Sequence, residues 1–108
     1  MSQVIFETLN LSGREVRIQA GWDNPTQCYY LTITSESTGK TLWDCMYQLE
    51  ILGGRSPKGF WDQVKVGMNC AFQDLGIELP EGFWDQLEPK KGNVIIRWKK
   101  NHWLETEI

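Results

Sequence analysis

The order of the sequence patterns constrains the fold most, because alternating apolar runs come first and a helical pattern follows them. Alternation of apolar and polar residues is typical of strands with one wet face, whereas apolar residues three and four apart are typical of helices. The alternating runs lie at 3–9, 15–20, 28–34 and 41–47, joined by short segments with turn residues such as Gly13 and Gly39. Strands grouped ahead of helices predict an α+β fold with a mainly antiparallel sheet.

The second half of the chain predicts two helices and one more strand. Apolar residues at helical spacing run from Phe60 to Leu75, and Gly76 is a natural helix stop. The remaining elements are expected to be a short helix between Pro80 and Pro89, a strand at 94–98 and a loosely held polar tail at 99–108. We therefore expect a sheet of about five strands with the long helix packed on one face.

Length, charge and cysteine content bound the class of protein. A chain of 108 residues with 41% hydrophobic residues matches one globular domain, so we expect a single domain over 1–108. The net charge of -3 argues against a surface built to neutralise phosphates. The cysteines, Cys28, Cys45 and Cys70, are too widely spaced for a metal-binding or redox pair, and no apolar run is long enough to span a membrane. We expect a cytoplasmic protein without membrane contact, metal or cofactor.

Residue patterns for catalysis are missing from the sequence. His102 is the single histidine and lies in the expected tail, where a positioned general base is not expected. The glycines form neither a phosphate loop nor a dinucleotide-binding fingerprint. We therefore predict no catalytic residues and no enzyme. An enzyme or small-ligand protein whose pocket is assembled from scattered residues stays open as an alternative.

Tryptophan is the distinctive signal, with six residues spread over the chain. Trp43 and Trp98 lie in predicted strands and are expected in the core. The other four are predicted to form a protein-binding set, because exposed tryptophan is enriched at the energetic centres of interfaces: Trp61, Trp84, Trp22 and Trp103. The alternative is that each of these side chains only covers the edge of a small core.

The segment GFWDQ occurs twice, at 59–63 and at 82–86. Each copy follows a proline and is followed by a branched apolar residue, as at two helix beginnings in which Phe points inward and Asp lies in the first turn. The alternative is a pair of similar tryptophan-bearing docking sites.

A second candidate contact surface lies near the carboxy terminus. Arg97, Lys99, Lys100 and Trp103 mix cations with an aromatic ring, a combination that can bind single-stranded nucleic acid by pairing phosphates and stacking bases. The acidic residues that follow, Glu105 and Glu107, argue against this use.

The segment GWDNPTQ at 21–27, followed by aromatic residues, resembles a GWDxPLQ motif of small bacterial proteins of unassigned function. Thr26 stands where that motif has leucine. The resemblance covers about a tenth of the chain and implies a bacterial or mobile-element origin without implying an activity.

The favoured hypothesis is a non-catalytic protein-binding module of the inhibitor, immunity or adaptor type from a bacterium or phage. Its partner would be another protein or a second copy of the chain. A nucleic-acid-associated module is the first alternative, and a small-ligand protein or enzyme is the second.

Overall fold

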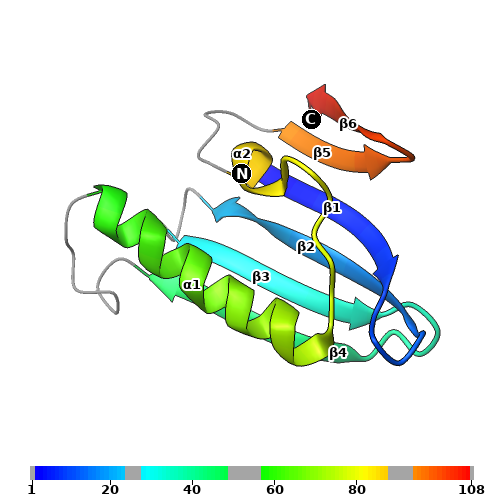
Figure 1. Ribbon diagram of the computed structural model, residues 1–108. Coiled ribbons are helices and arrows are strands. Elements are labelled where there is room, and N and C mark those ends of the chain that lie inside the picture. Colours follow the sequence, from blue (N-terminus) through cyan, green and yellow to red (C-terminus); the bar gives the residue numbers. More distant parts are fainter. Residues whose placement is uncertain (1, 24–27, 49–56, 88–93, 108) are drawn as a thin grey trace.

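The computed structural model describes residues 2–23, 28–48, 57–87 and 94–107. These residues form one sheet of six strands with two helices on one of its faces (Figure 1). The α+β class, the mainly antiparallel sheet and the long and short helices are confirmed. The elements are, in chain order, β1 (Ser2–Leu9), β2 (Glu15–Asp23), β3 (Cys28–Ser35), β4 (Thr41–Gln48), α1 (Pro57–Leu75), α2 (Phe83–Leu87), β5 (Val94–Lys99) and β6 (His102–Glu107).

The strand order is β4-β3-β2-β1-β5-β6. The first four strands form an antiparallel meander, which their short connections favour. After the two helices the chain returns on the other side of β1, where β5 pairs with β1 in parallel. β6 then folds back against β5 as an antiparallel hairpin. The first strand therefore lies inside the sheet, between β2 and β5.

The segment at 99–108 was expected to be a loosely held polar tail. Instead, His102–Glu107 forms a sixth strand. A two-residue turn reverses the chain after Lys99, with Lys100 at a φ of 57°. Trp98 and Trp103 then lie opposite each other, with ring centroids 4.9 Å apart. This aromatic cross-strand pair supplies apolar contact that the polar residues of β6 lack.

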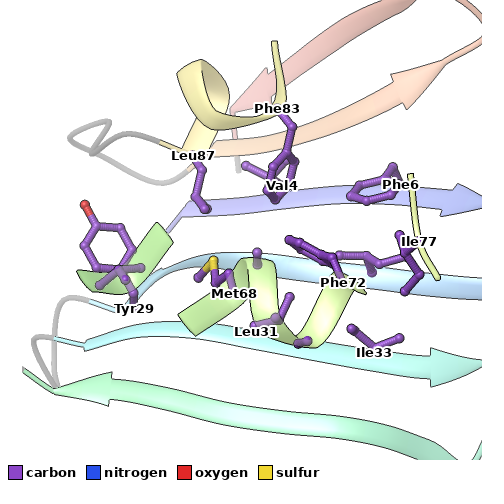
Figure 2. Close-up of a cluster of buried hydrophobic side chains, with 14 of the residues drawn as sticks. Val4, Phe6, Tyr29, Leu31, Ile33, Met68, Phe72, Ile77, Phe83 and Leu87 are labelled. Atoms are coloured by element: carbon purple, nitrogen blue, oxygen red, sulfur yellow. The ribbon is translucent and has the colours of Figure 1, made fainter. Parts of the chain in front are cut away.

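The core lies between the sheet and the helices. Alternation directs one set of strand side chains toward the helices, among them Val4, Phe6 and Ile18, which are all buried. The α1 stripe supplies Val64, Met68, Ala71 and Phe72, and α2 adds Phe83 and Leu87. Figure 2 shows Phe72 and Met68 from α1 facing strand residues such as Leu31.

The helix stop at Gly76 is confirmed. Gly76 has a φ of 64°, and the Ile77 amide donates to the Phe72 carbonyl at 2.8 Å, which closes the last turn. The first-turn expectation holds for one of the two GFWDQ copies. Asp85 lies in the first turn of α2, but no acidic residue lies in the first turn of α1, because α1 begins at Pro57 and Asp62 comes five residues later.

Candidate functional site

The predicted tryptophans lie along one continuous run of ring contacts, which we call the aromatic ladder. Ring centroids are 4.8 Å apart for Trp22 and Tyr29, 5.0 Å for Tyr29 and Trp61, and 6.3 Å for Trp61 and Trp84. The run continues at 5.0 Å from Trp84 to Phe83 and at 6.4 Å from Phe83 to Trp103. These distances are typical of favourable aromatic pairs, most of which meet edge to face. All four tryptophans of the predicted protein-binding set therefore belong to the aromatic ladder.

Different elements contribute the ladder. Trp22 lies in β2 opposite Tyr29 of β3, just beyond the alternating run predicted at 15–20. Trp61 comes from α1, Trp84 from α2 and Trp103 from β6, which the sequence placed in a tail. The pattern identified the tryptophans but not Tyr29 and Phe83, which connect them. Their local signals are the aromatic pair that starts β3 and the phenylalanine of the second GFWDQ copy.

All six tryptophans are half-buried and pack against the core. Trp43 and Trp98, which were expected in the core, are therefore only partly buried as well. The indole N–H of Trp43 is buried without a hydrogen-bond partner. The predicted contact residues thus pack against the core and are also partly exposed.

The Trp61–Trp84 pair is the centre of the ladder and has charged neighbours. The Lys65 ammonium lies 5.6 Å from the Trp61 ring centroid and 3.8 Å from the Asp62 carboxylate. Lys65 can thereby add a weak cation–π attraction to the aromatic contacts. Asp62, Glu81 and Asp85 are exposed, so the described charges around this pair are mainly acidic.

Trp103 is fixed at the other end of the ladder. Its indole N–H donates to the Glu81 carbonyl at 2.9 Å. Gly82, at a φ of 80°, lets the chain turn into α2 beneath this ring, and a Cβ there would lie 3.5 Å from the indole nitrogen. This hydrogen bond holds β6 to the segment before α2 and orients the Trp103 ring toward Phe83.

The predicted nucleic-acid set is divided by the sheet. Trp98 and Trp103 face each other on the side of the helices, so alternation places Arg97 and Lys99 on the opposite face of β5. Lys100 lies in the turn between the two strands. Trp103 and the two cations Arg97 and Lys99 therefore project from opposite faces of the sheet.

The described residues contain no group of three or more His, Cys, Asp or Glu side chains that could hold a metal ion. His102 is exposed in β6. No helix in the described part of the chain is long and apolar enough to cross a membrane. Two surface hollows lie beside β1.

Comparisons of the chain with protein-family models, with curated proteins and with solved structures give no significant match.

Proposed function

We propose that the protein is a non-catalytic protein-binding module that contacts its partner through the aromatic ladder. The observation that carries the proposal is the continuity of the ladder. Trp22, Trp61, Trp84 and Trp103 come from four elements, each keeps part of its ring accessible, and ring contacts join them. Half-buried, rigidly packed tryptophans are the side chains that most often dominate the binding energy of a protein interface.

The charged neighbours narrow the kind of partner. Asp62, Glu81 and Asp85 are exposed beside the ladder. Charges at the rim of an interface contribute mainly to the rate of association and to specificity, and they favour a partner surface of opposite sign. We therefore propose a protein partner with an apolar centre and basic residues around it. A second copy of this chain fits less well, because it would bring the same acidic rim against itself.

The test uses rim variants, since replacing the half-buried rings would also weaken the core. The tagged chain is used to capture a stoichiometric partner from the lysate of its host after nuclease treatment. The double variant Asp62→Arg, Asp85→Arg is expected to bind the purified partner at least about tenfold more weakly, and Glu36→Arg, an exposed change in the β3–β4 turn, is the matched control.

Three outcomes contradict the proposal. The first is equal binding by the rim variant and the control in titration calorimetry. The second is loss of every captured protein after nuclease treatment, which would favour a nucleic-acid partner. The third is self-association of the purified chain that the rim variant leaves unchanged in sedimentation velocity, which would place a dimer interface elsewhere.

A further inference from the structure

β1 and β5 part halfway along their length. They pair in parallel from Ser2 opposite Val94 to Ile5 opposite Arg97. Beyond that point β1 continues to Leu9 and β5 continues to Lys99, but the two strands no longer pair with each other. Figure 1 shows β1 curving away from β5 toward its own end. Among the described strands, the second half of β1 therefore has a neighbour on one side only.

The backbone groups of this half-strand point into the gap. The amide of Asn10, directly after β1, donates to the Arg14 carbonyl across the hairpin at 2.9 Å, so the backbone groups of even-numbered residues face β2. Successive residues of an antiparallel strand alternate in this respect, and the N–H and C=O groups of Glu7 and Leu9 consequently face away from β2. A row of such groups without a strand partner is a template for adding another strand.

Two surface hollows follow the same edge. One has a volume of about 420 Å³ and is lined by Ile5, Phe6, Glu7, Arg97, Trp98, Lys99 and Lys100. The next has about 360 Å³ and is lined by Glu7, Thr8, Leu9 and Glu15. They meet at Glu7, so together they extend from the point where the strands part to the end of β1. At a rise of about 3.4 Å per residue, this stretch is long enough for a strand of about four residues.

The gap between the second half of β1 and the end of β5, which we call the notch, is closed at one end, and this shape determines what can bind there. A strand that adds to β1 cannot continue past Ile5, because β5 occupies the edge of β1 from there on. An added chain must therefore end or turn at the closed end of the notch. Arg97, which pairs with Ile5, is exposed at that end, and the exposed residues Lys99 and Lys100 follow it along the chain. Glu7 is the single carboxylate in the lining of the larger hollow. A chain end with a negative charge fits this position, whereas an amino terminus would be repelled.

We propose that this notch binds the free carboxy terminus of an extended peptide, which pairs with Glu7 and Leu9 as an added strand. Its terminal carboxylate meets Arg97 at the closed end, beside Lys99 in the lining of the larger hollow, and the peptide therefore runs antiparallel to β1. This site lies on a different part of the molecule from the exposed rim at Asp62 and Asp85 and does not depend on the aromatic ladder.

The test uses acetylated heptapeptides of randomised sequence, prepared once as free acids and once as carboxy-terminal amides. The full chain is immobilised, and retained peptides are identified by mass spectrometry. We expect the free acids to be recovered at least about tenfold more efficiently than the amides. Arg97→Glu and Lys99→Glu are expected to abolish this preference, while Lys40→Glu, the same charge change in the exposed β3–β4 turn, leaves it intact.

Hydrogen exchange locates the peptide and separates this proposal from the previous one. With a retained peptide bound, the amides of Glu7 and Leu9 are expected to exchange more slowly, and Asp62→Arg, Asp85→Arg is expected to bind the peptide as the wild type does. Equal recovery of acids and amides, recovery of neither, or protection only around Trp61 and Trp84 would overturn the proposal. Circular dichroism confirms that each variant is folded.

Discussion

Gly76 shows how one residue fixes the end of α1 and its contact with the β1–β2 hairpin. Its φ of 64° lies in the left-handed region, and a Cβ there would overlap the side chain of Leu11. Gly76→Ala is therefore expected to lower the free energy of unfolding by about 2 kcal/mol or more, of which about 1 kcal/mol is backbone strain. Urea unfolding followed by tryptophan fluorescence measures the change.

Gly39→Ala is the matched control, because Gly39 has a φ of 69° and nothing lies within 4 Å of the added carbon. The backbone strain of an alanine at positive φ is the same at Gly39 as at Gly76, but the added carbon at Gly39 overlaps no other side chain. If both variants lose equal stability, the Leu11 contact contributes nothing. The additional change Leu11→Gly, which removes every Leu11 side-chain atom that overlaps the new carbon, is expected to restore part of the loss in Gly76→Ala only.

Tyr30 links β3 to the start of β1 and makes stability depend on alkaline pH. Its hydroxyl donates to the Ser2 carbonyl at 3.2 Å, and burial followed by the negative charge of Asp23 raises the pKa of Tyr30 to about 12. The ordinary pKa in the unfolded chain is about 10. The folded state thus holds the proton more tightly, and its contribution to stability is complete below about pH 10 and is lost as the pH rises toward 12.

Tyr30→Phe removes both the hydrogen bond and the titration. We expect a loss of about 1 kcal/mol at neutral pH. The decline in stability between pH 10 and 12 is expected to be shallower than in the wild type, as measured by urea unfolding at several pH values. A decline as steep as that of the wild type would show that another group causes it.

At the scale of elements, the strands that the sequence predicted best are those with clean alternation. In β2, Val16, Ile18 and Ala20 are buried and the residues between them, Arg17 and Gln19, are half-buried, so periodicity alone indicates this part of the strand. β6 has no such signal, because its residues are mostly polar and its one large inward ring is Trp103. Its strand conformation comes from pairing with β5, a tertiary effect that a local pattern does not contain.

The turn between β5 and β6 yields a prediction about this hairpin. Lys100 has a φ of 57° in a two-residue turn, a conformation in which glycine is favoured over residues with a side chain. Lys100→Gly is expected to raise the free energy of unfolding by about 0.5–1 kcal/mol, measured by urea unfolding. Asn101→Gly, at the neighbouring turn position where φ is not positive, is the control and is expected to stabilise nothing.

At the scale of the whole molecule, the sequence indicated which faces are apolar but not which strands are neighbours. The pairing of Val4 with Ile96 joins residues from opposite ends of the chain, and hydrophobic patterning would be satisfied equally well by other strand orders. The same limit applies to the candidate site. Composition singled out the tryptophans, but only the strand order and the helix positions bring Trp22, Trp61, Trp84 and Trp103 into one ladder.

Phe83 is where the parts of the molecule meet. It is 1% exposed, and its ring lies 5.4 Å from that of Phe6 in β1, 5.7 Å from that of Phe72 in α1 and 6.4 Å from that of Trp103 in β6. Phe83→Ala is expected to cost about 3–5 kcal/mol, because it leaves a cavity between all of these elements. Asp85→Ala, an exposed change in the same helix, is expected to cost a small fraction of that.

The shape of the unfolding transition then tests whether the aromatic contacts make one cooperative unit. If they do, the midpoints measured by circular dichroism and by tryptophan fluorescence coincide in the wild type. They also coincide in Phe83→Ala, where the substitution shifts both midpoints by the same amount. An earlier fluorescence midpoint in the variant alone would mean that β5 and β6 separate from the rest of the sheet before it unfolds. That result would locate the weakest boundary at the notch between β1 and β5, where the two strands pair over four residues.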